Sequence, residues 1–214
     1  TTDYFQICCQ GQWSGETITM ARSDSGKRIG LLGGSFNPAH QGHLHISLSA
    51  LRRLNLDEIW WMVSPQNPLK DRSGMGEFNF RKKSAEMIAR DPRIIVTDIE
   101  ITLGTQFTVD TLGALKETFP DFKFVWLMGA DNLRQIPKWK GWRQIFRQVP
   151  VAVFPRPSFS RRALGGKAAR RFDKFRIKST RAPRLANLRP PAWVFLHTQP
   201  ITTSATRLRE RLEN

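Results

Sequence analysis

Residues 28–47, RIGLLGGSFNPAHQGHLHIS, decide how the rest of the chain can be arranged. An apolar run over residues 29–32 ends at Gly33-Gly34, and a helical pattern begins near Gly42. Such a run before two glycines is typical of the carboxyl end of a buried parallel strand. Glycine lets the backbone approach a ligand closely, and the next helix offers N–H groups and the positive end of its dipole to an anion. The stretch therefore predicts a nucleotide-phosphate site.

Two histidines, His40 and His43, lie across this turn and can donate to phosphate oxygens. A lone histidine is more often structural, and the stretch is not a P-loop because no Gly-Lys-Ser/Thr follows. The order of strand, Gly-Gly-Ser-Phe, Asn-Pro and HxGH resembles the nucleotidyltransferase superfamily, whose signature is (G)(S/T)FDPxHxGH. Asn37 replaces the usual Asp. Within the superfamily the chain most resembles the bacterial nicotinate-nucleotide adenylyltransferase family.

Length and composition fit one α/β domain with a sizeable core: 214 residues, 40% of them hydrophobic. No run approaches the ~20 apolar residues that span a bilayer. The N-terminal stretch lacks a basic segment followed by a long apolar one, which argues against a signal peptide. Cys8 and Cys9 are adjacent and seldom bridge, so we expect a reducing, cytoplasmic location.

The charge balance is strongly basic, with 34 Lys and Arg against 18 Asp and Glu, a net charge of +16. It is concentrated in residues 156–189, which hold 12 basic residues and one acidic residue, Asp173. Such a balance suits a polyanion. We interpret this segment as a solvated helix-loop region, and a nucleic-acid-binding face is the main non-enzyme alternative.

Hydrophobic periodicity predicts alternating strands and helices along the chain. Strands are expected at 28–32, 58–63, 93–98, 123–128, 149–154 and 193–197, and helices at 42–54, 78–90, 109–119 and 205–212. Residues 1–27 show no periodicity and are expected to form a flexible extension; residues 28–214 form the domain. The expected fold is a Rossmann-like open parallel sheet with helices on both faces.

The resemblance implies that two segments bind ATP, the glycine- and histidine-containing stretch described above and a second one near the C-terminus. Near the C-terminus, residues 201–207 resemble the family's I-S-S-T-x-I-R box, with Thr206 where Ile is usual. A hydroxyl-rich helix start with an arginine one turn later suits phosphate, although it is also an ordinary N-cap. The implied catalytic residues are His40, His43 and Arg207. The implied ATP-binding residues are Gly33, Gly34, Ser35, Phe36, His40, Gly42, His43, Thr203, Ser204 and Arg207.

Residues 100–112, EITLGTQFTVDTL, resemble the family's E-x-x-x-x-G-x-S-Y-T-x-D-T-L box. Thr105 lies one place before the family's Ser, and Phe107 stands where Tyr is usual. The resemblance implies that Thr105, Phe107 and Thr108 face the pyridine carboxylate of a mononucleotide. A carboxylate accepts well from N–H groups near a helix start. The simpler alternative is that Thr108 only N-caps the helix expected at 109–119.

Three further residues complete the implied mononucleotide site. Asp131 follows an expected strand, so it should point into the crevice at the strand ends, and it resembles the family's Asp that holds a ribose hydroxyl. Trp139 matches the tryptophan that lies against the nicotinate ring, whereas we expect Trp142 in helix packing. Lys70, in a polar loop, resembles a lysine near the triphosphate and is grouped with these residues.

The resemblance implies transfer of AMP from ATP to nicotinate mononucleotide, giving nicotinate adenine dinucleotide and pyrophosphate in NAD biosynthesis. The mononucleotide phosphate is already anionic, so the reaction needs no side-chain nucleophile. No carboxylate cluster for a metal is evident, and we expect Mg²⁺ to arrive on ATP. Nicotinamide mononucleotide and phosphopantetheine are alternative acceptors. The sequence does not fix the oligomeric state.

Overall fold

The computed structural model describes residues 26–65, 75–156 and 159–196, and its centre is a parallel sheet. Within these residues the sheet has seven strands in the order β3-β2-β1-β4-β5-β7-β6, and every neighbouring pair is parallel. The strands are β1 (Arg28–Gly34), β2 (Glu58–Val63), β3 (Ile94–Thr97), β4 (Lys123–Gly129), β5 (Val151–Phe154), β6 (Arg176–Ile177) and β7 (Trp193–Phe195).

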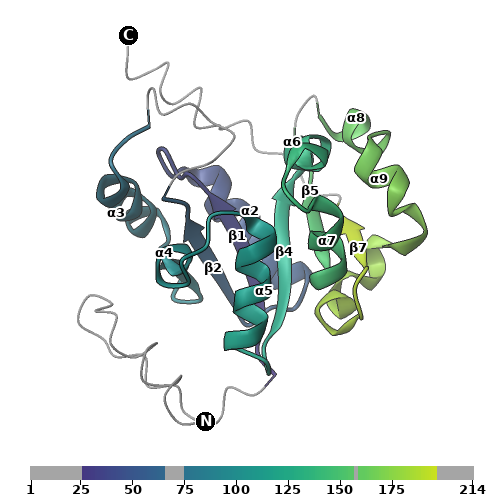
Figure 1. The fold of residues 1–214 in the computed structure, drawn as a ribbon, viewed down its shortest axis with the longest axis horizontal. Coiled ribbons are helices and arrows are strands. Elements are labelled where there is room, and N and C mark those ends of the chain that lie inside the picture. The colour runs from purple at the N-terminus through teal and green to yellow at the C-terminus, as the bar shows by residue number, and fades with distance from the viewer. Residues whose placement is uncertain (1–25, 66–74, 157–158, 197–214) are drawn as a thin grey trace.

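Helices connect the strands and cover the sheet (Figure 1). The α-helices are α2 (Gln41–Arg53), α3 (Phe78–Ile88), α4 (Ile99–Thr102), α5 (Thr108–Thr118), α6 (Ala130–Gln135), α7 (Trp142–Gln148), α8 (Ser160–Leu164) and α9 (Lys167–Arg171). Short 3₁₀ helices are η2 (Ile136–Lys138), η3 (Asp173–Phe175) and η4 (Ser179–Asn187). None of the helices in these ranges is long and apolar enough to cross a membrane.

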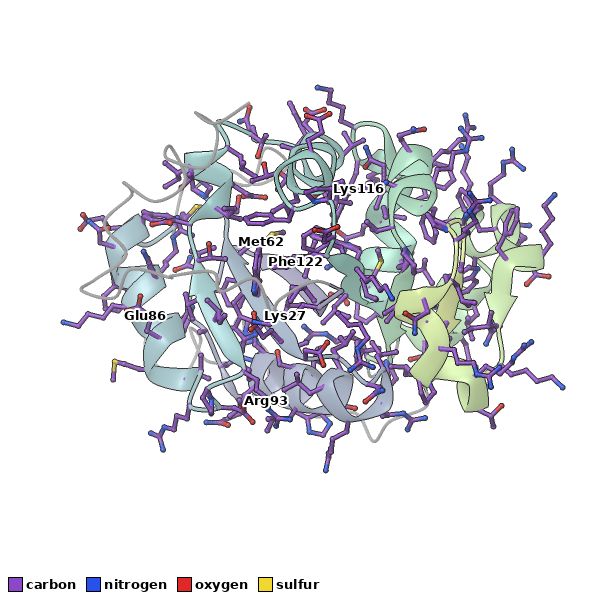
Figure 2. All side chains as sticks on the ribbon, turned by 90° about the horizontal axis from the view of Figure 1, so that it is seen from below. Lys27, Met62, Glu86, Arg93, Lys116 and Phe122 are labelled. Atoms are coloured by element: carbon purple, nitrogen blue, oxygen red, sulfur yellow. The ribbon has the colours of Figure 1, made fainter. Side chains whose placement is uncertain are left out.

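Side chains alternate between the two faces of the sheet, so each strand contributes to two separate cores. In β2, Trp60 and Met62 enter one core, while Ile59 and Trp61 enter the other. Residues of α5 to α9 pack in the first core, and residues of α2, α3 and η4 pack in the second. Figure 2 shows side chains filling both sides of the sheet, with Met62 in the interior. The predicted two-sided α/β fold is confirmed.

The position of β1 in the sheet creates a crevice. β1 pairs with β2 on one side and with β4 on the other. The helix after β1, α2, lies on one face, whereas α6, which follows β4, lies on the opposite face. Because the two connections leave in opposite directions, the carboxyl ends of β1 and β4 border a crevice at which open α/β sheets bind ligands.

Most expected elements in the described ranges are present, with boundaries shifted by a few residues. The strand expected at 149–154 begins at Val151, because Val149 ends α7. Strand β6 and the short helices α4 and α6 to α9 were not predicted, since none is long enough to show a clear period. The expectation that Thr108 N-caps a helix is wrong: α5 begins at Thr108, and Phe107 is the N-cap, without a side-chain cap bond.

The sheet also holds residues just before β1. The Gly26 N–H donates to the Asp121 carbonyl, and the Lys27 carbonyl accepts from the Lys123 N–H. Lys27 also pairs with Glu58 at 2.7 Å. The fold therefore includes two residues that we assigned to the N-terminal extension. The rest of that segment, and the helix expected at 205–212, lie outside the described residues, and the division of the chain at residue 27 stays a proposal.

Candidate active site

His40 and His43 lie at the start of α2 and hold each other in one orientation. The Gly42 N–H donates to His40 Nδ1 at 3.0 Å, and the His40 N–H donates to His43 Nδ1 at 3.2 Å. An imidazole nitrogen that accepts a hydrogen bond carries no proton, so a neutral ring must carry its proton on Nε2. The turn therefore fixes both neutral rings as Nε2–H donors, with centroids 3.9 Å apart.

Both histidines are held neutral at physiological pH. Burial lowers the pKa of His40 to about 4, and the positive charge of Arg156 lowers it further. Burial also lowers the pKa of His43 well below its usual value, and the nearby His40 and Arg156 act in the same direction. The pair can donate hydrogen bonds to an anion without exchanging a proton with it.

Arg156 lies two residues beyond the end of β5 and faces Asp131, which follows β4. Arg156 Nε and Asp131 Oδ1 are 3.6 Å apart, too far for a hydrogen bond. Both atoms are buried and have no hydrogen-bond partner among the described residues. Gly129 makes this arrangement possible, because a Cβ at residue 129 would overlap Asp131 Oδ1. The crevice thus presents a loosely paired cation and carboxylate, each with one buried polar atom that lacks a hydrogen bond among the described residues.

The Gly-Gly-Ser-Phe segment, which ends β1 and begins the next loop, is shaped by packing. A Cβ on Gly33 would lie 2.7 Å from the Trp126 ring, so this glycine makes room for a core side chain. Phe36 is buried with a φ of 45°, in the left-handed region that non-glycine residues seldom adopt. Its ring stacks on Trp61 at 5.1 Å and contacts His43 at 4.8 Å. Gly34 and Ser35 lie between these two anchored residues.

Arg81, on α3, ties together the loops beneath the crevice. It is 1% exposed, and its guanidinium donates to the carbonyl oxygens of Ser35, Ser64, Pro65 and Gly76 at 2.7–3.0 Å. Burial lowers the pKa of Arg81. No single carboxylate neutralises it within these contacts, so four carbonyl dipoles stabilise the charge. Arg81 therefore fixes the loop after β1 against the loop after β2.

The residues implied for the pyridine ring lie beside one another. Lys140, next to Trp139, places its ammonium 4.5 Å from the centroid of the Phe107 ring and pairs with Asp110 at 2.9 Å. Gly141 follows with a φ of 58°, and a Cβ there would lie 3.1 Å from Val109. These contacts bring the Trp139 turn against the start of α5. Trp139 is partly buried on the edge of the core.

Trp142 is buried and packs edge-on against Phe172, as expected for a core residue.

Four predicted site residues lie outside the described residues: Lys70, Thr203, Ser204 and Arg207. Gly42 is buried at the second position of α2. Within residues 26–65, 75–156 and 159–196, no group of three His, Cys, Asp or Glu side chains could hold a metal ion. The donors gathered in the crevice are N–H groups and a guanidinium, which suit phosphate oxygens.

Arg156 was not predicted as a site residue, because in the sequence it is the first residue of the basic segment. The rule that placed Asp131 in the crevice applies equally to Arg156, because it also follows the carboxyl end of a strand. The other basic residues of the segment within the described residues are exposed, as both a solvated helix-loop region and a nucleic-acid-binding face require. Figure 2 shows nitrogen-tipped side chains extending outward from this yellow-green part of the chain.

The low pKa of His40 predicts that acid destabilises the fold. The unfolded chain binds a proton at His40 below about pH 6.5, whereas the folded chain does so only near pH 4. The contribution of His40 to the free energy of unfolding is therefore fully present above pH 6.5. It decreases by about 3 kcal/mol as the pH falls to 4. The difference in unfolding free energy between wild type and His40→Gln should shrink by that amount as the pH falls from 7 to 4. Denaturant unfolding of both proteins at pH 7, 5.5 and 4 measures it. Parallel stability profiles would contradict a neutral, buried His40.

A doubly wound parallel sheet with two histidine donors and an arginine at its switch point defines a Rossmann-like nucleotidyltransferase. The cytidylyltransferase-like family matches residues 31–211 of the chain. A probable nicotinate-nucleotide adenylyltransferase of Parvibaculum lavamentivorans is 54% identical over 186 residues, which cover 87% of this chain and 92% of the relative. The relative of the same description from Gluconobacter oxydans is 54% identical over 183 residues, 86% of this chain and 94% of its own. The chain belongs to the nicotinate-nucleotide adenylyltransferase family.

Among solved structures, the fold is similar to that of the Plasmodium falciparum nicotinic acid mononucleotide adenylyltransferase complexed with NaAD. The two share a TM-score of 0.65 at 18% sequence identity, over 86% of this chain and 83% of the other. At this identity the similarity concerns the fold alone. It confirms the Rossmann-like arrangement that the strand order defines.

Proposed function

We propose that the protein transfers AMP from ATP to nicotinate mononucleotide, giving nicotinate adenine dinucleotide and pyrophosphate, a step of NAD biosynthesis. The observation that carries the proposal is the set of donors gathered at the switch point, which have no acceptor among the described residues: two neutral imidazole N–H groups and the Nε–H of Arg156. Together they present positive potential and directed donors to a polyphosphate. The chain shares its family with relatives described as nicotinate-nucleotide adenylyltransferases. This membership supports ATP and nicotinate mononucleotide as the substrates.

The proposed step is a direct displacement at phosphorus. A phosphate oxygen of the mononucleotide forms a bond to the α-phosphorus of ATP while the bond from that phosphorus to the bridging oxygen breaks. The electron pair of the broken bond leaves with pyrophosphate. Because the nucleophile is already an anion, the protein contributes alignment and stabilisation of the charge on the transferred group. His40 and His43 do so as neutral donors, and Arg156 as a fixed cation.

Arg207, Thr203 and Ser204 remain proposed phosphate ligands, and Gly33, Gly34, Ser35, Phe36 and Gly42 form the proposed turn around the triphosphate. Asp131 is the proposed partner of a ribose hydroxyl, since its Oδ1 is buried without a partner among the described residues. Mg²⁺ would neutralise phosphate charge while bound to ATP, because the crevice offers it one carboxylate and mainly N–H donors. A cytoplasmic location agrees with this metabolic role and stays a prediction.

The experiment that tests the function is an assay of pyrophosphate release with ATP and one acceptor at a time. We expect turnover with nicotinate mononucleotide, less with nicotinamide mononucleotide, and none with phosphopantetheine, because Trp139 and Phe107 provide a site for an aromatic ring. Turnover that requires no pyridine mononucleotide would contradict the proposal. A chain that binds nucleic acid with steep salt dependence and releases no pyrophosphate would support the alternative built on residues 156–189.

Two variants should separate ring binding from recognition of the carboxylate. Trp139→Ala removes stacking area, which serves acid and amide alike, so kcat/KM should fall similarly for both mononucleotides. Thr108→Pro removes the N–H of the first residue of α5, where proline is tolerated. It should reduce kcat/KM for the acid more than for the amide, by a factor corresponding to about 1–3 kcal/mol. Should Trp139→Ala abolish the preference while Thr108→Pro preserves it, the two roles are reversed.

A further inference from the structure

Glu100 is a buried acid that the proposed chemistry does not use. It is the second residue of α4, and its side chain lies in the interior with an exposed fraction of 6%. The side chains of Ser64, after β2, and Thr111, on α5, lie close to its carboxyl group and favour its charged form. One carboxyl oxygen, Oε2, is buried and has no hydrogen-bond partner among the described residues. An ionised carboxylate with one buried oxygen left unpaired is poorly solvated.

Hydrogen bonds connect Glu100 directly to the turn proposed to face the pyridine carboxylate. Thr111 Oγ1 lies 2.9 Å from Thr105 Oγ1 and donates to the Phe107 carbonyl at 3.2 Å. The Thr105 N–H donates to the Glu100 carbonyl at 2.9 Å. Glu100 is therefore joined to Thr105 through the backbone, and the Thr111 hydroxyl contacts the same turn. A change in the charge of Glu100 can act on this turn through Thr111 and through space.

The elements around Glu100 carry few unpaired charges. Arg81 of α3 spreads its charge over carbonyl groups, that of Ser64 among them. Asp98, two residues before Glu100, pairs with Lys82 at 2.7 Å. Asp110 of α5 pairs with Lys140. Burial raises the pKa of Glu100 to about 7, against the opposing effect of Ser64 and Thr111. Both protonation states are consequently populated near neutral pH.

We propose that Glu100 is a positioning residue that sets the preference for a pyridine carboxylate over the corresponding amide. Neutral Glu100 leaves the turn free of negative charge, so the carboxylate binds at the N–H groups around Phe107 and Thr108. Ionised Glu100 repels the carboxylate across a water-poor region and draws the single Thr111 proton away from the Phe107 carbonyl. The neutral amide is not repelled. This inference rests on the proposed function, since it assumes a pyridine ring at this turn.

The test is the ratio of kcat/KM for nicotinate mononucleotide to kcat/KM for nicotinamide mononucleotide, measured from pH 6 to 8.5. Titration of the substrate phosphate, of ATP and of other site groups affects both substrates and cancels in the ratio. In the wild type the ratio should fall about tenfold as pH rises, with a midpoint near the pKa of Glu100. Glu100→Gln should keep a high ratio that does not change with pH. Glu117→Gln, an exposed acid on α5, should behave as wild type.

Thr111→Val provides a second variant that preserves side-chain volume. It removes a hydroxyl that stabilises the carboxylate, so the midpoint of the ratio should move to higher pH. If Glu100 had a purely structural role, the substitutions would change neither the kcat/KM ratio of the two mononucleotides nor the pH midpoint of that ratio. A wild-type ratio that is constant with pH, a profile that persists in Glu100→Gln, or an unmoved midpoint in Thr111→Val would each overturn the proposal. Absence of turnover with both mononucleotides would instead overturn the proposed function.

Discussion

Replacing His43 with alanine should lower kcat by about 10²–10³-fold, equivalent to about 2.7–4 kcal/mol, with a smaller change in KM. His43 is fixed as an Nε2–H donor by the His40 N–H, at a buried helix start. A donor held in place before the reaction needs no reorganisation when charge develops on the transferred phosphoryl group. Its contribution should therefore be larger in the transition state than in the substrate complex.

The measurement is steady-state kinetics with nicotinate mononucleotide on a variant shown to be folded. His43→Gln keeps an N–H donor and should recover part of the lost kcat. His45→Ala, on the same helix two residues later, is the matched control and should keep nearly normal turnover. Near-normal kcat in folded His43→Ala would remove this histidine from the catalytic group.

The second large effect concerns stability. Arg81→Met should lower the free energy of unfolding by about 3–5 kcal/mol, because methionine fills the space but leaves four buried carbonyl groups without their donor. Denaturant unfolding measures this loss. Arg90→Met, which removes an exposed arginine just beyond α3, should change stability by less than about 0.5 kcal/mol. Equal effects of the two substitutions would show that the carbonyl contacts of Arg81 contribute little.

Local sequence patterns were sufficient to predict the fold and part of the candidate site. After its first residue, Glu58, strand β2 is an uninterrupted apolar run, as a strand buried on both faces requires, and its predicted boundaries match those observed. The helix start after Gly33-Gly34 places His40 and His43 where the spacing indicated. These features depend on residues close together in sequence, so periodicity and turn chemistry can reveal them.

The remaining features depend on contacts between distant residues, which no local pattern encodes. Arg81 reaches a carbonyl 46 positions away, and in the sequence it reads as one more helix-surface cation. Arg156 lowers the pKa of histidines that precede it by more than a hundred residues. The acid of the 100–112 segment, Glu100, carries no sign in the sequence that it is buried. Buried charges of this kind become apparent only when packing is known.

The most direct test of the account follows the α-phosphorus of ATP. The protein is incubated with Mg²⁺, nicotinate mononucleotide and ATP labelled at the α-phosphate, and the products are separated. Attack of the mononucleotide phosphate at that atom predicts that all transferred label appears in nicotinate adenine dinucleotide and that the pyrophosphate released is unlabelled. Label retained in ADP or in free AMP, with the mononucleotide unchanged, would contradict adenylyl transfer as the reaction of this site.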